Sequence, residues 1–344
     1  MEREPVLSVE HLNVKFSLRG KILHAIRDVS LDLYKGETLA IVGESGSGKS
    51  VLTKTFMGLL DANGWIESGS ILYNGQDLAK YQTEKEWLSI RGKEIAMVLQ
   101  DPMTSLNPLK TIGAQIEEAL KLHQNLTGPE AYRRMIETLT DVGITEPERR
   151  CRQYPHEFSG GMRQRVVIAI AIACKPQILI CDEPTTALDV TIQAQILHLI
   201  RELVRKYHLT TVYITHDLGV VANVADRVAV MYAGDIVEIG QSREVFYDAR
   251  HPYTWALLSS LPQLGIRGEK LFSIQGTPPN LFLEVKGDAF APRNPHALKI
   301  DFEQRPPFFE VSPTHFARTW LLHPDAPKVE PPEVLKRLRQ EEVS

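Results

Sequence analysis

The segment GESGSGKS, residues 43–50, combines glycines with a lysine and a serine in the spacing GxxxxGK[ST]. The strand-like ETLAIV (37–42) precedes it and the apolar-periodic VLTKTFMGLL (51–60) follows it, so the segment lies where a strand passes into a helix. In that context the glycines let backbone N–H groups surround an anion, the lysine reaches the β- and γ-phosphates, and the serine can bind Mg²⁺. A flexible turn is the alternative, and the flanking strand and helix count against it. The sequence therefore predicts a phosphate-binding loop made of Gly43, Glu44, Ser45, Gly46, Ser47, Gly48, Lys49 and Ser50.

The composition is that of a globular chain of 344 residues, with 39 lysines and arginines, 43 acidic residues and a net charge of −4. This balance gives no electrostatic reason to expect nucleic-acid binding. The start, MEREPVLSVE, lacks the apolar core of a signal peptide, and the longest apolar run, 166–174, is far shorter than the roughly 20 residues that cross a bilayer. We therefore expect a cytoplasmic chain. Its cysteines form no CxxC pair and are expected to be free thiols: Cys151, Cys174 and Cys181.

Strand-like and helical segments alternate along the first 250 residues. The runs LAIV, IAMVL, ILIC and TVYIT are separated by helical patterns such as TIQAQILHLIRELVRKY, which predicts an α/β domain with a largely parallel sheet over 1–250. Strand signals vanish between about 101 and 160, where helical spacing indicates an inserted helical subdomain. Proline-rich segments such as GTPPN and APRNP then predict a loop-rich extension over 251–330, followed by a charged tail at 331–344.

Two further segments carry groups suited to phosphate chemistry. In ILICDEPTTALD an apolar strand ends in Asp182 and Glu183, whose side chains point in opposite directions, so one can face a metal ion and the other an attacking water. In FSGGMRQR, Ser159 is expected to cap a helix whose first residues, Gly160 and Gly161, leave the backbone donors open to an anion. A solvated turn and an ordinary capped helix are the respective alternatives.

Single polar residues follow two other predicted strands. Gln100 comes after IAMVL and can contact a metal ion or water, and His216 comes after TVYIT and can donate to a γ-phosphate. Taken alone, each is as expected for a polar strand cap.

The order GESGSGKS, QDPMTSLNP, FSGGM, CDEPTTALD and THD resembles that of the ATP-binding cassette (ABC) ATPases over about residues 6–247. The resemblance implies a P-loop ABC ATPase core with a parallel-sheet RecA-like subdomain, an antiparallel β subdomain and a helical signature subdomain, with ATP and Mg²⁺ as ligands. The usual signature LSGGQ reads FSGGM here, and the phosphate-facing serine and glycines remain. The roles implied by the resemblance are the Q-loop glutamine for Gln100, the signature for Ser159, Gly160 and Gly161, the strand-end acid for Asp182, the catalytic base for Glu183, the D-loop acid for Asp189 and the switch histidine for His216.

The same resemblance implies that two cassettes face each other head to tail, with ATP between the phosphate loop of one and the signature of the other. Mg²⁺ would be held by Ser50, Gln100 and Asp182. Adenine would stack on an upstream aromatic residue, for which Phe16 is the candidate, and a core position for this ring is the alternative.

A narrower resemblance is to the D-type ATPase subunits of dipeptide and oligopeptide importers, a group that includes nickel importers. The segments that carry it are QDPMTSLNP and FSGGMRQR, with HPYT and GTPPN in the tail. This implies a second, homologous ATPase chain, two membrane permease chains, an extracytoplasmic binding protein and a peripheral position on the cytoplasmic face of the membrane. We expect oligopeptides or dipeptides as the cargo, with nickel chelates and antimicrobial peptides as alternatives. A soluble cassette acting on nucleic acid or ribosomes and a non-catalytic regulatory cassette are the rival hypotheses.

One departure from that subfamily concerns its iron–sulfur cluster. Many members have a tail similar to GCxFxPRC followed by another cysteine, whereas this chain reads GDAFAPRNPHALKID. Asp288, Asn294 and Asp301 stand where thiolates would be needed, so no iron–sulfur cluster is expected.

Overall fold

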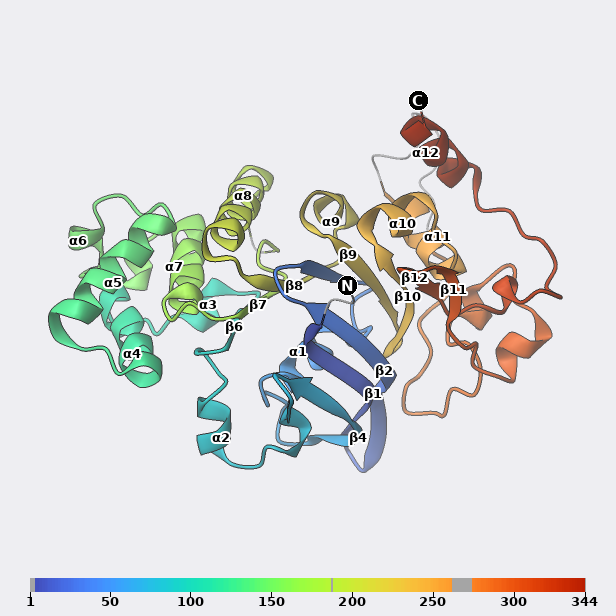
Figure 1. Ribbon diagram of the computed structural model, residues 1–344, viewed down its shortest axis with the longest axis horizontal. Helices are drawn as coiled ribbons and strands as arrows, with labels where there is room; N and C mark the ends of the chain where they lie inside the picture. Colours follow the sequence, from blue (N-terminus) through green and yellow to red (C-terminus); the bar gives the residue numbers. More distant parts are fainter. Residues whose placement is uncertain (1–3, 187, 262–273, 344) are drawn as a thin grey trace.

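The computed structural model describes residues 4–186, 188–261 and 274–343. Two β-sheets form its centre, a group of helices lies at one end, and the loop-rich C-terminal part lies at the other (Figure 1). The α/β class expected from the sequence is confirmed. Residues 262–273 of the predicted extension lie outside the described residues.

The larger sheet has the strand order β11-β12-β10-β9-β3-β8-β7-β6 within the described residues. The strands from β9 to β6 are parallel to one another, while β10, β12 and β11 pair in antiparallel fashion. Nearly all residues of its central strands are buried and most are apolar, as expected for parallel strands that are covered on both faces. The strands are β3 (Thr38–Val42), β6 (Ile95–Val98), β7 (Ile178–Asp182), β8 (Thr210–Thr215), β9 (Arg227–Tyr232), β10 (Asp235–Gln241), β11 (Phe309–Ser312) and β12 (His315–Ala317).

The smaller sheet is antiparallel and has the order β2-β1-β4-β5. Its buried residues, such as Leu12 and Ile26, belong to the same apolar cluster as Leu52 of helix α1 (Lys49–Thr55). Ile41 and Ile180 of the larger sheet belong to this cluster too, so both sheets share one apolar core. Its strands are β1 (Pro5–Leu18), β2 (Lys21–Tyr34), β4 (Gly64–Tyr73) and β5 (Gln76–Asp77).

The helices of the middle of the chain form a second apolar core. Thr111 caps α4 and Ser159 caps α7 by accepting backbone N–H groups, which fixes where these helices begin. Figure 1 shows α4 to α7 grouped at one end of the molecule. These helices are α3 (Pro102–Ser105), α4 (Ile112–Gln124), α5 (Gly128–Asp141), α6 (Pro147–Arg150) and α7 (Gly160–Ile172).

The remaining helices lie outside this group. They are α1 (Lys49–Thr55), α2 (Glu84–Leu88), α8 (Val190–Tyr207), α9 (Leu218–Val224), α10 (Ser242–Tyr247), α11 (Pro252–Ser259) and α12 (Glu333–Val343). Short 3₁₀ turns occur at Leu78–Lys80, Pro155–Glu157, Ala291–Arg293, Lys299–Phe302 and Trp320–Leu322. Across the parts of the chain that the structure describes, no helix combines the length and the apolar character that a membrane span requires.

The C-terminal part is joined to the larger sheet. The hairpin of β11 and β12 pairs with β10, and the buried ring of His315 lies 2.7 Å from the equally buried carboxylate of Glu238. The same carboxylate accepts the backbone N–H groups of Arg250 and His251 at 2.6 and 3.0 Å. Strand pairing and this buried polar cluster thus fix the extension to the core.

Candidate nucleotide-binding site

The loop between β3 and α1 has the conformation that its glycines allow. Gly43, Gly46 and Gly48 have φ angles of 152°, 79° and 104°, which residues with a side chain rarely adopt. At Gly43 the requirement is also spatial, because a Cβ atom there would lie 2.1 Å from the carbonyl oxygen of Met231. The backbone can therefore pass close to the neighbouring strand only with glycine at this position.

Lys49 lies buried within the loop that precedes it. Its Nζ donates to the carbonyl oxygens of Gly43 and Glu44 at 2.8 and 2.9 Å. Burial lowers the pKa of the Lys49 ammonium, and the nearby carboxylates of Glu183 and Asp182 oppose this shift. A cation held inside a loop with little access to water interacts strongly with an anion placed beside it.

Ser50 and Asp182 meet although 132 positions separate them in the sequence. The Ser50 hydroxyl donates to Asp182 Oδ1 at 3.0 Å, since β3 and β7 are both paired with β8 and end at the same edge of the sheet. Burial raises the pKa of Asp182, and the hydrogen bond from Ser50 opposes this shift. A hydroxyl and a carboxylate oxygen side by side are ligands that suit Mg²⁺, so the residues fit this ion.

Glu183 is the point where the other candidates converge. Its Oε2 accepts hydrogen bonds from the Gln100 amide at 3.0 Å and from the Thr186 hydroxyl at 2.9 Å, and Nδ1 of His216 lies 3.3 Å from its Oε1. Glu183 has a φ of 46°, an uncommon conformation for a residue with a side chain. Three segments thus orient one carboxylate at the edge of the sheet beside Lys49.

A cavity of about 720 Å³ adjoins this cluster, and of the described candidates Thr186, His216 and Asp182 are not part of its lining. Lys49, Ser50, Gln100 and Glu183 line one part of it, and Phe16 lines another. Phe16 is 8% exposed and belongs to the apolar core, and it also lines the cavity, so its position is compatible with both alternatives that the sequence left open. The lining of the cavity therefore combines charged and polar side chains with apolar ones.

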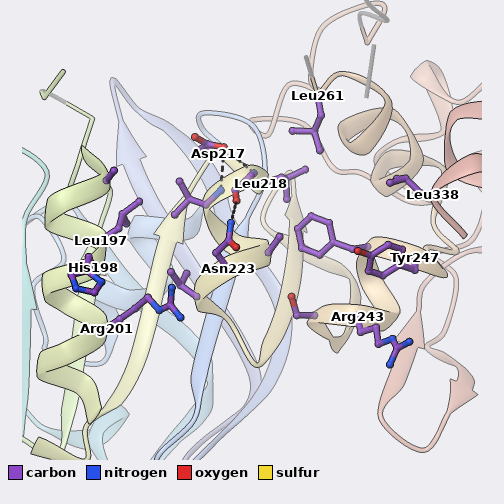
Figure 2. Close-up of a pocket in the computed structure, with 17 residues that line it drawn as sticks. Leu197, His198, Arg201, Asp217, Leu218, Asn223, Arg243, Tyr247, Leu261 and Leu338 are labelled. Atoms are coloured by element: carbon purple, nitrogen blue, oxygen red, sulfur yellow. Dashed lines mark hydrogen bonds between the residues drawn. The ribbon is translucent and has the colours of Figure 1, made fainter. Parts of the chain in front are cut away.

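A larger cavity, of about 810 Å³, lies elsewhere between helices. Figure 2 shows it with Leu197, His198 and Arg201 on α8 facing Leu218 and Asn223 on α9. Of the described residues, none of those predicted to bind a nucleotide lines it. A triphosphate needs a dense set of donors, so the smaller cavity is the candidate site.

Comparison with known proteins identifies the two parts of the chain separately. Residues 26–186 match the model of the ABC transporter family, and residues 237–300 match that of the oligopeptide/dipeptide transporter C-terminal region. The chain is 60% identical to the oligopeptide transport ATP-binding protein AmiE of Streptococcus pneumoniae, an alignment that covers 98% of this chain and 95% of that one. It is 59% identical to OppD of Bacillus subtilis, over 96% and 93% of the two chains. The chain belongs to the oligopeptide/dipeptide ABC transporter ATPases.

A solved structure of an ATP-binding cassette is similar to this chain. The dimeric ATP-binding cassette MJ0796, in a post-hydrolysis state bound to ADP and Pi, is 28% identical and superposes with a TM-score of 0.61 over 69% of this chain and 99% of that one. Members of the ABC ATPase family bind and hydrolyse ATP, so this chain is an ATPase.

Within this ABC ATPase the signature lies apart from the cavity. Ser159 accepts the backbone N–H of Met162 at 3.4 Å, which confirms its predicted N-cap position. A Cβ on Gly161 would lie 2.7 Å from the Ile192 side chain, so glycine allows close contact between α7 and α8. Asp189 caps α8 by accepting from Ile192 at 3.0 Å. Among the described residues that line the cavity, neither the signature nor Asp189 appears.

Some contacts at the site come from distant or weakly patterned residues, which no sequence motif indicated. Thr186 lies three positions after Glu183, where a turn returns its hydroxyl to the carboxylate, and this spacing was the signal available. Residues 279–282 of the extension also line the cavity, and no motif indicated their position. The cysteines are buried and free, as predicted: Cys151, Cys174 and Cys181.

Proposed function

We propose that this ABC ATPase binds ATP with Mg²⁺ in the cavity beside Lys49 and hydrolyses it with Glu183 as the general base. The observation that carries this proposal is the arrangement of Glu183, which accepts from Gln100 and Thr186 and lies 3.3 Å from the ring of His216. A carboxylate oriented from several sides can accept a proton from a water placed beside it.

The other residues divide the binding of the triphosphate. Backbone N–H groups of the loop from Gly43 to Ser50 bind phosphate oxygens together with the ammonium of Lys49, except the N–H of Glu44, which donates to the Tyr253 hydroxyl. Ser50, Asp182 and Gln100 hold the metal ion. When bound, Mg²⁺ neutralises part of the phosphate charge. His216 donates to the γ-phosphate and senses its presence. Phe16 contributes an apolar surface for adenine, which its place in the cavity supports.

A second, homologous ATPase chain completes the site in this proposal. Ser159, Gly160, Gly161 and Asp189 are separate from the cavity of their own chain, so they are available to a nucleotide held by a partner. The related cassette MJ0796 is described as dimeric, which supports a head-to-tail pair. We propose a heterodimer, because the subfamily resemblance implies two different ATPase chains.

The cargo that fits best is an oligopeptide or dipeptide. Relatives that cover nearly the whole chain are described as oligopeptide and dipeptide transport ATP-binding proteins, and residues 237–300 match the family of their C-terminal regions. The proposal includes two membrane permease chains, an extracytoplasmic substrate-binding protein and a peripheral position on the cytoplasmic face of the membrane. ATP binding and hydrolysis in the ATPase pair would then drive uptake through the permeases.

Many members of the subfamily have cysteines that bind an iron–sulfur cluster, and the residues at those positions of this chain make other contacts. Side-chain oxygens of Asp288, Asn294 and Asp301 accept backbone N–H groups of nearby residues at 2.9, 2.9 and 2.6 Å. Oxygen ligands do not suit an iron–sulfur cluster, so we propose that this chain holds none. Stoichiometric iron and acid-labile sulfide after anaerobic purification would contradict this.

The hydrolytic role is tested with Glu183→Gln in the complex purified from host membranes. We expect ATP turnover to fall about 100-fold or more, while ATP still binds, because the amide keeps the shape of the carboxylate and loses its basicity. Glu202→Gln, on an exposed part of α8, is the matched control and should turn over ATP at the parent rate. Near-normal turnover by Glu183→Gln would refute the assignment of the base.

The assembly is tested by mass spectrometry of the chains that co-purify in mild detergent. A second cassette ATPase and two multispanning proteins are expected. Soluble or ribosomal partners alone would contradict the importer assembly.

A further inference from the structure

The C-terminal extension contacts the phosphate-binding loop directly. Arg293 is bound to Glu44 through both guanidinium Nη atoms, with Nη1 2.6 Å from Oε2 and Nη2 3.0 Å from Oε1. The Arg293 side chain is 4% exposed and that of Glu44 28%, so water screens this bidentate pair little. Glu44 is the second residue of the loop whose other end carries Lys49 and Ser50.

A second contact from the same part of the chain holds the backbone of the loop. The Tyr253 hydroxyl accepts the N–H of Glu44 at 2.8 Å. Tyr253 packs against Tyr232, with ring centroids 4.5 Å apart, and the Tyr232 hydroxyl accepts from Arg293 at 3.1 Å. The loop is therefore fixed at Glu44 by an ion pair, a backbone hydrogen bond and an aromatic support, all of which are lost if the extension detaches.

The extension also forms part of the cavity wall. Residues 279–282 line the same cavity as Lys49, Glu183 and Phe16. The segment is attached to β2, since the N–H of His24 donates to the carbonyl oxygen of Leu281 at 3.0 Å. Phe282 adds an aromatic side chain that is 40% exposed, the type of surface on which a nucleobase stacks.

We propose that the extension supplies two parts of the nucleotide site: Arg293 is a positioning residue that holds the phosphate loop through Glu44, and residues 279–282 form the wall beside the base. This inference rests on the proposed nucleotide site and adds to it residues that lie more than 200 positions from the loop. It gives the extension a role in nucleotide affinity in addition to its structural attachment.

The two parts predict different responses to ligands. Inorganic tripolyphosphate reports on the loop alone, whereas ADP reports on the loop and the base wall together. Arg293→Gln should weaken both ligands by about tenfold, because an unsupported loop presents its N–H groups less well. Phe282→Ala should weaken ADP by about fivefold and leave tripolyphosphate unchanged. Affinities are measured by isothermal titration calorimetry on the full chain with Mg²⁺.

Matched controls separate these effects from loss of folding. Arg305 is also an extension arginine with a bidentate carboxylate partner, Asp235, and it does not touch the loop. Arg305→Gln is therefore expected to lower the thermal midpoint without changing the affinity for ADP. Leu283, 67% exposed and next to Phe282, provides the second control, and Leu283→Ala should bind ADP as the parent does.

A double-mutant cycle tests the coupling between Glu44 and Arg293. If the pair acts as a unit, Glu44→Gln combined with Arg293→Gln should bind ADP no more weakly than the weaker single variant. Arg293→Lys, which keeps the charge and loses the second hydrogen bond, should lie between the parent and Arg293→Gln.

Lys49→Ala distinguishes failure of this inference from failure of the site. Parent-like ADP affinity in Lys49→Ala would refute the site itself. Loss of ADP binding in Lys49→Ala with parent-like binding in both Arg293→Gln and Phe282→Ala would overturn only the role of the extension. An equal loss of affinity in Arg305→Gln would overturn it too, because the effect would then be one of general stability.

Discussion

Asp288 is a buried carboxylic acid in the extension, and Asp288→Asn is expected to stabilise the protein at alkaline pH much more than in acid. The residue is 8% exposed, and its Oδ1 accepts the N–H of Phe290 at 2.9 Å, a bond that an asparagine oxygen can also accept. Burial raises the pKa of Asp288 to about 7, with the carboxylates of Asp301 and Asp235 adding to the shift and the guanidinium of Arg27 opposing it.

The neighbouring imidazole does not supply a compensating charge. The Nε2 atom of His251 lies 3.9 Å from Oδ2 of Asp288, and burial lowers the pKa of His251 to about 3. Its Nδ1 accepts the N–H of Tyr253 at 3.0 Å, which places the ring proton on Nε2. The ring is therefore neutral over the pH range of the experiment.

The sign of the effect follows from proton binding in the two states. The pKa of an unfolded aspartate is about 3.9, so between pH 4 and 7 the folded state binds more protons at Asp288 than the unfolded state. Stability contributed by this group falls as the pH rises through that window and is constant above it. A shift of about 3 pKa units corresponds to about 4 kcal/mol at pH 8 and to about 2 kcal/mol at pH 5.5.

The assay is urea denaturation of the parent and of Asp288→Asn at these two pH values, followed by tryptophan fluorescence. The variant should gain more stability at pH 8 than at pH 5.5, by about 2 kcal/mol. Asp325→Asn, at a side chain that is 93% exposed, is the control and should change neither value. Equal gains at both pH values, or a loss at pH 8, would refute the reasoning.

Three further predictions concern the loop, a thiol and Phe16. Gly43→Ala should lower the free energy of unfolding, measured by urea denaturation, by at least about 3 kcal/mol, because the new Cβ would lie 2.1 Å from the Met231 carbonyl oxygen. Gly46→Ala has open space around the new Cβ and should lower it by about 1 kcal/mol, through the strained backbone angle alone. Equal losses in the two variants would contradict the spatial argument. The fully buried Cys181 thiol, whose pKa is raised by burial to about 12, should resist iodoacetamide at pH 8 until urea unfolds the chain, and labelling of the native protein would show that it is accessible. Phe16→Leu should keep the thermal midpoint within about 3 °C and weaken ADP about fivefold; unchanged affinity in calorimetry would leave Phe16 as a core residue only.

The part of the site that the sequence predicted is encoded in short contiguous segments. The loop around Lys49 and the acids after the strand ILICD each carry their pattern within about ten residues. Because parallel strands end at one edge of a sheet, the contact between Ser50 and Asp182 follows once both segments are assigned to that sheet. Capping of α7 by Ser159 is equally local and was predicted for the same reason.

The contacts that could not be predicted join segments without a pattern of their own. Glu44 and Arg293 are 249 positions apart, and the arginine lies in a proline-rich stretch with no helical or strand periodicity. The hairpin of β11 and β12 is short, so its residues gave no alternation to read, and the extension was expected to be loops. Tertiary packing, which one sequence does not reveal, decides where such segments settle.

The pairing of β12 with β10 has a consequence for how such proteins are inherited and engineered. A chain cut after residue 250 would leave β10 as a bare sheet edge and Glu238 as an acid without its imidazole inside an apolar interior. Chimeras that join the cassette of one importer to the tail of another would disrupt this interface between β10 and β12 unless both sides of it came from the same protein. We therefore expect the ATPase and its tail to be transferable between transporters only as a single unit.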